Sequence, residues 1–399
     1  MHGPLSGIRV LDFTWAQQGP YATVILSDLG AEIIKVEKRI VGDLGRGVTS
    51  DWYQGDGFCP YFWAHDRGKK SITLDLAQSA AKEIVLKLAE VCDVAVNNFR
   101  LHVMDALGIG YEAMKRRNPK IIFARATGFG SQGPLAHRPA FDIAGQAMGG
   151  MMSVTGMPGT PPQPAGACIA DQTGATNLAL AILAALVARE RYGVGQQVEV
   201  SLYGSMIGLQ AWEIDSYTVW GQLPPRAGSA HPLFQGALWG SFETADGWIV
   251  LGGVSDERWP RFCDALAFPE LANDARFQHG IDRAKHGVFL TGLARERLRQ
   301  RNTADWLEVF ERYDLVTARV QNYADIAEDA QARANAYITE VTDEQRGAMK
   351  IVGSPIHLSQ TPVQPQGWPP ELGQHTEEIL LEMGYTWEDI GRLKDREVI

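Results

Sequence analysis

Short apolar segments alternate with longer segments of helical character along the first 200 residues. Apolar runs of strand length occupy residues 7–13, 31–36, 71–75, 93–97, 120–126 and 197–202. Segments with helical patterning lie between them, at 19–30, 77–91, 111–117 and 172–190. Because strands that alternate with helices pair in parallel, this part of the chain predicts a doubly wound, Rossmann-like α/β sheet.

The pattern changes near residue 222. The segment Leu223-Pro-Pro-Arg-Ala-Gly228 concentrates residues that break helices and strands, which makes it a candidate domain boundary. A hairpin is predicted over 237–253, and polar helical segments follow it. These features predict a smaller α+β domain over 223–325, inserted into the chain.

Strand character returns over 336–354, and two segments at 373–383 and 387–394 are predicted to be terminal helices. We therefore expect residues 1–222 to form the first part of a large α/β domain. Residues 326–399 are expected to return to that domain.

The composition is that of a folded globular protein. Of the 399 residues, 45% are apolar and 21% are charged, and the formal net charge is -10. An acidic chain without a basic stripe is a poor candidate for binding nucleic acid or an anionic membrane surface. The longest apolar run, 178–188, is far shorter than the roughly 20 residues that a membrane span needs, so no membrane association is expected.

The cysteines and the N-terminal residues indicate a reducing compartment. The N-terminal segment has neither the basic nor the apolar region of a secretory signal. The cysteines are far apart and form no C-x-x-C pair, which favours buried thiols over a disulfide framework or a zinc site. A cytoplasmic location is therefore expected. The four cysteines are Cys59, Cys92, Cys168 and Cys263.

One glycine pattern imitates a dinucleotide-binding motif. Gly128-Phe-Gly130-Ser-Gln-Gly133 follows a predicted strand, but Pro134 and Pro139 stand where that motif would open a helix. A glycine-rich turn is the better interpretation. The sequence contains no Walker A or G-x-S-x-G motif, and its nine histidines lack metal-ligand spacing, so no metal site is expected.

Asp171 is the candidate for covalent chemistry. It lies between a turn-forming stretch, which ends at Gly166, and a long apolar segment that predicts a helix. Aspartate is a common helix N-cap, so a purely structural capping role is one interpretation. The other is a nucleophile, because a carboxylate at a helix start can face a cleft. The residues alone leave both interpretations open.

Short motifs along nearly the whole chain occur in the order typical of one enzyme family. Through them the chain resembles the family III CoA-transferases, which include formyl-CoA transferase and the carnitine CoA-transferase. The resemblance implies a Rossmann-like large domain, an inserted small α+β domain and a homodimer of interlocked subunits. The motifs are Pro4-Leu-x-Gly-Ile-x-Val-Leu-Asp-Phe13, Gly19-Pro20, Leu29-Gly-Ala-Glu-Ile-Ile-Lys-Val-Glu37, Gly68-Lys-Lys-Ser-Ile-Thr-Leu-Asp75, Asn98-Phe-Arg100, Ala170-Asp171, Gly193-x-Gly-Gln-x-Val-x-Val200 and Gly373-x-His-Thr-x-Glu-Ile-Leu380.

The resemblance makes Asp171 the nucleophile of a CoA-transferase. Its carboxylate is expected to attack an acyl-CoA thioester, form a mixed anhydride and then an aspartyl-CoA thioester, and pass CoA to a small carboxylic acid. With an ordinary pKa near 3.9 it would be ionised at neutral pH and need no general base. Backbone amides near Asp171, or the side chain of Gln17 at a position where the family has glutamine, would stabilise the oxyanions.

The resemblance also implies a site for coenzyme A, which acts as a substrate and not as a tightly bound cofactor. Ligands of doubly wound sheets bind at the loops that follow the first strands. Many family members carry an arginine where this chain has Ala106, and His102 is a candidate to compensate for it. The expected CoA-binding residues are Ala16, Lys38, Leu74, Asn98, Phe99, Arg100 and Arg138.

Two other functions remain to be weighed. An α-methylacyl-CoA racemase needs a histidine 30 positions before the aspartate, but 171 − 30 = 141 and that residue is Phe141. Asp142, an acidic position in the transferases, is expected either to orient the acceptor or to cap the helix at 143–151. A non-catalytic CoA-binding protein would make Asp171 dispensable. The sequence does not identify the acyl donor or the acceptor.

Overall fold

The computed structural model describes residues 3–47, 59–234, 238–343 and 347–399. The chain divides into two compact units. The first unit comprises Met1–Gly149, Gly166–Leu209 and Ala330–Ile399, and the second comprises Gly150–Ala165 and Gln210–Asp329. The second unit thus includes residues 150–165 and 210–222, which the sequence pattern assigned to the large domain. A local pattern does not reveal such associations, because they depend on contacts between distant segments.

A six-stranded sheet forms the centre of the first unit, and every strand pair in it is parallel. The strand order is β3-β2-β1-β4-β5-β6. This order confirms the doubly wound sheet expected from the alternating pattern. The strands are β1 (Arg9–Asp12), β2 (Glu32–Glu37), β3 (Lys69–Thr73), β4 (Val94–Asn97), β5 (Ile122–Thr127) and β6 (Gln197–Ser201).

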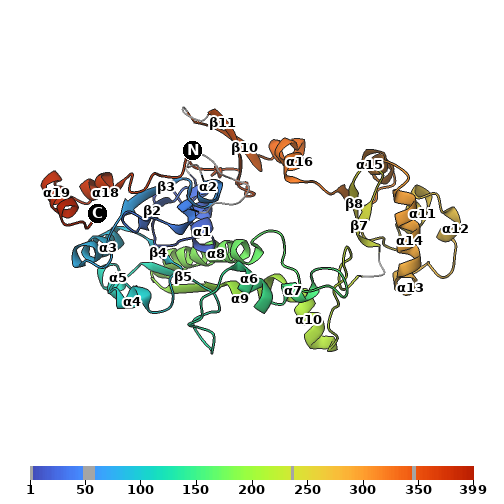
Figure 1. Ribbon diagram of the computed structural model, residues 1–399, viewed down its shortest axis with the longest axis horizontal. Coiled ribbons are helices and arrows are strands. Elements are labelled where there is room, and N and C mark those ends of the chain that lie inside the picture. Colours follow the sequence, from blue (N-terminus) through green and yellow to red (C-terminus); the bar gives the residue numbers. More distant parts are fainter. Residues whose placement is uncertain (1–2, 48–58, 235–237, 344–346) are drawn as a thin grey trace. The chain divides into compact units, whose positions relative to one another are not determined.

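Helices cover both faces of this sheet, and successive strand residues point to opposite layers (Figure 1). Leu11 and Ile34 face a core that includes α3 (Ser79–Val91) and α5 (Tyr111–Arg117). Val10 and Ile33 face a second core, formed with α1 (Gln18–Asp28) and α8 (Ile169–Tyr192). Burial on both faces explains why the strands are nearly continuous apolar runs.

The C-terminal helices pack in the core that contains Leu11 and Ile34. Helix α18 (Thr376–Glu382) buries Ile379 and Leu380 in the same core as α3, and α19 (Trp387–Asp395) adds Ile390. Figure 1 shows both helices, in red, beside the blue strands and helices of the N-terminal part. Lys70 of β3 forms an ion pair with Glu378 at 2.7 Å. The two predicted terminal helices are therefore confirmed.

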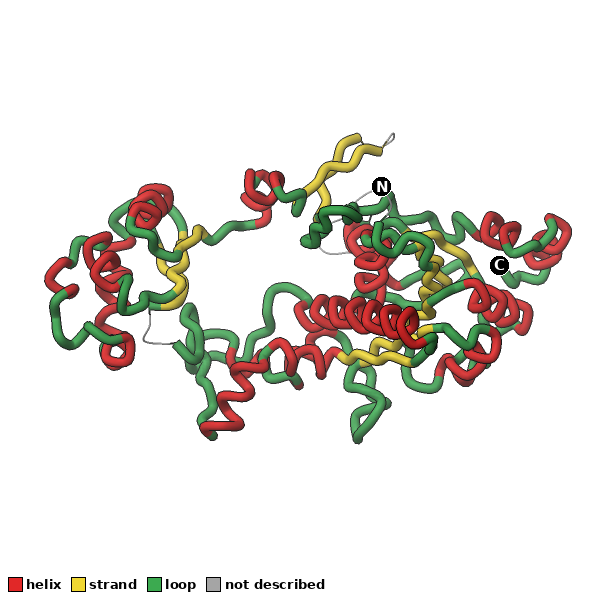
Figure 2. The backbone as a smooth tube through the Cα atoms, turned by 180° about the vertical axis from the view of Figure 1, so that it is seen from behind, coloured by secondary structure: helices red, strands yellow, loops and turns green. Residues whose placement is uncertain are grey.

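Helix α8 is the longest element, with 24 residues. By length and composition alone it is apolar enough to cross a membrane. Its buried residues pack against α1, β5 and β6, and Figure 2 shows it lying along the strands of the sheet. The helix predicted over 172–190 is confirmed, and Gly193 ends it in a left-handed conformation with φ 70°.

The first unit contains further short elements. Several of its helices were not predicted. Among them, α2 (Pro60–Asp66) holds three aromatic residues and α9 (Leu202–Leu209) holds two glycines, and such residues are weak helix formers. The others are η1 (Leu44–Gly47), α4 (Val103–Ala106), α6 (Asp142–Met148), α17 (Ala330–Ala334) and the antiparallel pair β10 (Ile338–Asp343) and β11 (Gly347–Val352).

The second unit contains an antiparallel sheet and a helical layer. The strands are β7 (Trp239–Glu243), β8 (Trp248–Gly252) and β9 (Thr317–Arg319), in the order β7-β8-β9. This confirms the predicted hairpin, although residue 237 lies outside the described residues. The helices are α7 (Met151–Val154), α10 (Ala211–Trp220), α11 (Trp259–Ala265), α12 (Pro269–Ala272), α13 (Gly280–Lys285), α14 (Gly287–Leu298), α15 (Thr303–Arg312) and α16 (Tyr323–Glu328).

Candidate active site

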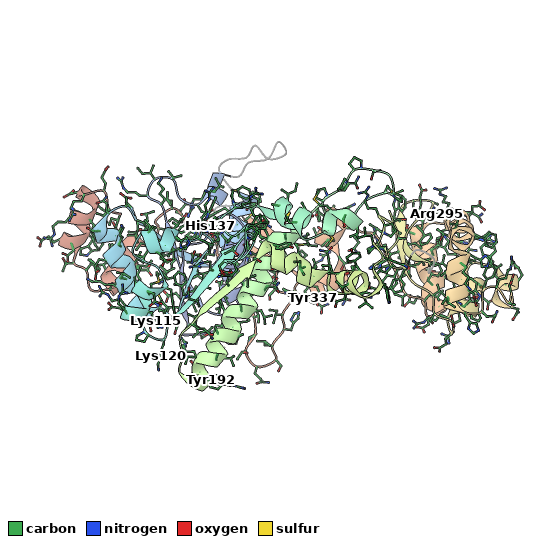
Figure 3. All side chains as sticks on the ribbon, turned by 90° about the horizontal axis from the view of Figure 1, so that it is seen from below. Lys115, Lys120, His137, Tyr192, Arg295 and Tyr337 are labelled. Atoms are coloured by element: carbon green, nitrogen blue, oxygen red, sulfur yellow. The ribbon has the colours of Figure 1, made fainter. Side chains whose placement is uncertain are left out.

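A cavity of about 330 Å³ opens beyond the carboxyl ends of β1, β4 and β5. Strands β1 and β4 are neighbours at the point where the strand order reverses, which is where open α/β sheets bind ligands. The loops after these strands form the walls, and α8 contributes Asp171. In Figure 3, His137 lies in the loop after β5, whereas Lys120 and Tyr192 lie at the other end of β5 and α8.

Asp171 stands in the first turn of α8 and borders this cavity. The N-cap residue of α8 is Cys168, and it makes no side-chain capping hydrogen bond. Asp171 is the third residue of the helix, so the capping role that competed with catalysis does not apply to it. Among the residues that the structure describes, none donates a hydrogen bond to its half-buried carboxylate.

Asp142 fixes the start of α8 from a neighbouring helix. Its Oδ1 accepts hydrogen bonds from the backbone N–H groups of Ala170 at 2.7 Å and Asp171 at 3.1 Å. Its Oδ2 accepts a hydrogen bond from Gln146 at 2.6 Å. The expected alternative that Asp142 caps its own helix is therefore wrong. Phe141 is the N-cap there, and the Asp142 carboxylate is aimed at α8.

Burial raises the pKa of Asp171 to about 7, and the negative charge of Asp142 raises it further. The expectation of an ordinary aspartate, fully ionised at neutral pH, is therefore wrong. Asp171 therefore titrates much closer to neutral pH than an ordinary aspartate does. The sequence gives no access to this shift, because burial beside a second carboxylate arises only in the fold.

The loop after β1 is held in one conformation by side chains from other loops. Asn98 accepts a hydrogen bond from the backbone N–H of Trp15 at 3.0 Å and donates one to the carbonyl of Trp15 at 2.7 Å. Asp43 accepts one from the backbone of Ala16 at 3.1 Å. These bonds retain Ala16 in a left-handed conformation, φ 66°, which non-glycine residues seldom adopt. Gln17 and Gln18 follow at the start of α1 and border the cavity.

A buried ionic network lies beneath this loop, and sequence analysis missed it. Lys35 pairs with Asp43 at 2.6 Å and with Asp66 at 3.1 Å, and Lys69 pairs with Asp66 at 2.8 Å and with Asp12 at 3.1 Å. Burial alone would lower the pKa of Lys35, but Asp66 and Asp43 raise it well above its ordinary range. A lysine between Ile34 and Val36 in a buried strand was the available clue.

A second cavity, of about 420 Å³, adjoins the first and shares Trp15, Leu44, Phe99 and Arg100 with it. Lys38 borders only this second cavity. Their volumes lie in the range of small-molecule binding sites, and the shared lining residues make them neighbours.

The structure brings most of the predicted site residues to these cavities. Leu74 is an exception, because its side chain is buried in the hydrophobic core. Asp142 borders neither cavity but contacts the helix that carries Asp171. Those that border a cavity are Ala16, Gln17, Lys38, Asn98, Phe99, Arg100, Arg138 and Asp171.

Two residues at the cavity were not predicted to take part in the site. Tyr61 of α2 borders it, and burial together with the charge of Asp171 raises the pKa of its phenol. His137 borders it too, and its ring centroid lies 5.5 Å from that of His102. His137 lies in a loop between Pro134 and Pro139, and Tyr61 lies in a short aromatic helix. Neither segment has a sequence pattern that would place it at this cavity.

One group of side chains comes close enough together to suggest metal ligands. The candidate ligand atoms of Asp142, Cys168 and Asp171 lie within 4.8 Å of one another. Both oxygens of Asp142 already accept hydrogen bonds from α8 and α6, and nothing else at this place points to an ion. The absence of a metal site stays a prediction.

Comparison with known proteins is decisive for the family. Residues 5–376 match the family described as CoA-transferase family III. The chain belongs to this family. It is 37% identical to a succinyl-CoA:mesaconate CoA-transferase of Haloarcula hispanica, over 96% of this chain and 97% of the relative. It is 34% identical to an acetyl-CoA:oxalate CoA-transferase of Acetobacter aceti, over 90% of each chain.

Solved structures agree with this family III assignment. The fold matches that of a CAIB/BAIF family protein from Brucella suis with a TM-score of 0.85 and 31% sequence identity, covering 96% of this chain and 100% of the other. Family III CoA-transferases act on CoA thioesters, so the chain is an enzyme of CoA transfer, as the sequence motifs implied.

Proposed function

We propose that this enzyme moves CoA from an acyl-CoA thioester to a small carboxylic acid through covalent intermediates on Asp171. The observation that carries the proposal is the position of Asp171. Its carboxylate borders the cavity beyond β1, β4 and β5, receives no hydrogen bond from the described residues, and stands on a helix start that Asp142 fixes. A desolvated carboxylate without hydrogen bonds is more nucleophilic than one in water.

The chemistry consists of successive acyl transfers. An Asp171 oxygen attacks the thioester carbonyl of the donor, the carbon–sulfur bond breaks, and a mixed anhydride and CoA thiolate result. The thiolate attacks the aspartyl carbonyl, which releases the donor acid as a carboxylate and leaves an aspartyl-CoA thioester. The acceptor carboxylate attacks that carbonyl in turn, and the released thiolate attacks the new anhydride. Acyl-CoA leaves and the Asp171 carboxylate is restored, without net proton transfer.

The two adjoining cavities support a place for CoA. We assign the nucleotide to the cavity beside Lys38 and the thioester end to the cavity beside Asp171, since Phe99 and Arg100 border both. Arg138 contributes a further cation beside the cavity that Asp171 borders. In this arrangement the pantetheine arm passes the loop that Asn98 holds in place.

The relatives suggest the class of acceptor. Their names specify transfer to mesaconate, oxalate and glutarate, all short dicarboxylic acids. We propose a short dicarboxylic acid as one substrate of this enzyme. A panel of such acids incubated with succinyl-CoA or acetyl-CoA, followed by mass spectrometry of the CoA esters, would identify the pair.

Trapping of the intermediate tests the covalent step. Incubation with an acyl-CoA donor and hydroxylamine should convert Asp171 to a hydroxamate, which peptide mass spectrometry detects. Asp171→Asn keeps the size of the side chain and should show neither label nor turnover. A labelled peptide elsewhere, or full turnover in Asp171→Asn, would contradict the proposal.

His137 is the observation in favour of a racemase, because the structure brings it to the same cavity as Asp171. The racemase histidine position is nevertheless Phe141, which cannot carry a proton. Incubation of a chiral 2-methylacyl-CoA in D₂O distinguishes the two functions. A transferase leaves the α-hydrogen in place, whereas a racemase replaces it with deuterium.

We further propose that the enzyme is a homodimer with interlocked subunits. Leu180, Ala184 and Val187 form an exposed apolar stripe on one face of α8. In the second unit Val219 and Trp220 are also largely exposed. Apolar surface of this extent is typical of a face covered by a partner, and a second copy of the chain is the occupant that the family resemblance implies.

A further inference from the structure

Gln18 presents an unsatisfied amide at the active site. It is the first residue of α1, directly after Gln17, and only 6% of it is exposed. Its Nε2 is buried and has no hydrogen-bond partner among the described residues. The side chain borders the same cavity as Asp171. A buried amide N–H without an acceptor is costly, at roughly 1–3 kcal/mol, so its retention calls for an explanation.

The position of the amide is set by a glycine of α8. A Cβ atom at Gly174 would lie 2.5 Å from Nε2 of Gln18 and 3.1 Å from its Cδ. Only glycine therefore allows the amide to lie against this helix without displacement. Residue 174 is three positions after Asp171, and such residues lie on the same helical face.

The backbone N–H groups of residues 169–172, around Asp171, all donate to acceptors within the protein. Asp142 accepts from the N–H groups of Ala170 and Asp171. The N–H of Ile169 donates to the carbonyl of Ala167 at 2.8 Å, and that of Gln172 donates to the carbonyl of Cys168 at 3.0 Å. These four backbone donors are thus engaged, which makes a neighbouring side chain the candidate donor to the oxyanion.

We propose that Gln18 is a catalytic hydrogen-bond donor for the oxyanion that forms on the carboxyl carbon of Asp171. This inference rests on the proposed covalent function. When CoA thiolate or the acceptor carboxylate attacks that carbon, the carbonyl oxygen gains a full negative charge, and Nε2 of Gln18 donates an N–H to it. No proton is transferred, and the charge returns to the leaving group when the tetrahedral adduct collapses. Gln17 remains the candidate donor for oxyanions on the acyl carbon of the substrate.

Gln18→Met tests this role, because methionine has a similar volume and no donor. We expect kcat to fall by about 10²- to 10³-fold, as for the loss of one oxyanion donor, while the Kd for CoA stays unchanged. In quenched-flow experiments the anhydride should still form, and its conversion to the aspartyl-CoA thioester, detected by the mass of CoA on the Asp171 peptide, should be slow. Gln172→Met is the matched control, since this neighbour of Asp171 does not border the cavity.

A structural role predicts the opposite pattern. If Gln18 only fills space, Gln18→Met keeps kcat within about threefold of the wild type, and the inference is then wrong. Gln18→Leu provides the same comparison should the methionine variant fail to fold. Failure of the covalent function itself shows separately, as turnover in Asp171→Asn and an unlabelled Asp171 peptide in the wild type.

Discussion

The carboxylate of Asp142 accepts a hydrogen bond from the backbone N–H of Asp171 at 3.1 Å, and it also lies close enough to raise the pKa of that residue. One side chain therefore both fixes the backbone at Asp171 and opposes the ionisation of its carboxyl group. These two effects can be separated by substitution. An asparagine retains an acceptor oxygen but loses the charge, whereas an alanine loses both.

Asp142→Asn should shift the ascending limb of the pH–rate profile to lower pH, because removing a nearby negative charge lowers the pKa of Asp171. The maximal kcat should stay within about one order of magnitude of the wild type, since the amide oxygen can still accept from the α8 backbone. Asp142→Ala should lose substantially more, because the helix start is no longer held. An ascending limb of Asp142→Asn at the same pH as that of the wild type would show that the charge of Asp142 does not act on Asp171.

The wild-type enzyme should show a kcat/KM that rises with pH and levels off above an apparent pKa of about 7. The reason is that only ionised Asp171 attacks the thioester. Steady-state rates between pH 5.5 and 9, at saturating acceptor, measure this limb. A profile that is flat between about pH 5.5 and 9 would mean that Asp171 is ionised throughout the range, as an ordinary aspartate is.

Asp171 should also impose a pH dependence on stability. Its pKa rises from 3.8 in the unfolded chain to about 7 in the fold, so the folded state binds more protons between these values. The stability that goes with the bound proton is fully present below pH 3.8 and is lost as the pH rises through about 7. Asp171→Asn should therefore raise the free energy of unfolding by ~1–3 kcal/mol at pH 8 and by less at pH 5. Urea denaturation at the two pH values measures the difference, and equal effects would contradict the raised pKa.

CoA binding should depend on Phe99 and Lys38, which border the cavity assigned to the nucleotide. Isothermal titration should show a Kd for CoA raised by roughly tenfold in Phe99→Ala, which loses stacking surface, and by less in Lys38→Ala, whose charge is exposed. Lys115→Ala is the matched control, because this exposed lysine of α5 borders neither cavity. Unchanged affinity in both test variants would place the nucleotide elsewhere.

The dimer should persist on dilution. An interlocked pair cannot separate without unfolding, because its interface is also part of its core. Analytical ultracentrifugation from high to low micromolar concentration should give one species with twice the mass of the chain. An active monomer in this range would exclude the interlocked arrangement.

The sheet could be predicted from local pattern, and Asp171 could be singled out as a candidate. The apolar runs at residues 7–13 and 31–36 contain β1 and β2, since strands buried on both faces need continuous apolar sequence. For Asp171 the pattern left a helix cap and a nucleophile both open, because aspartate is common at helix starts. Its role came from the family resemblance and not from the pattern.

Other parts of the site were beyond sequence reasoning. Lys35 and Lys69 are charged residues in strands, and nothing local shows that both are fully buried with aspartates from distant loops. The environment of Gln18 depends on Gly174, about 150 residues further along the chain, and a missing Cβ leaves no pattern. Contacts of this kind, between residues far apart in the sequence, form only when separate loops converge at one edge of the sheet.

The ionic network around Lys35 also fixes the stage at which the loop at Ala16 loses its conformational entropy. Asp43 bridges that network and the backbone of Ala16, so the left-handed turn is complete before any ligand arrives. Ordering of this loop takes place during folding and not during binding. The attraction between CoA and the site can then be directed to the reacting bonds, where it lowers the barrier to transfer.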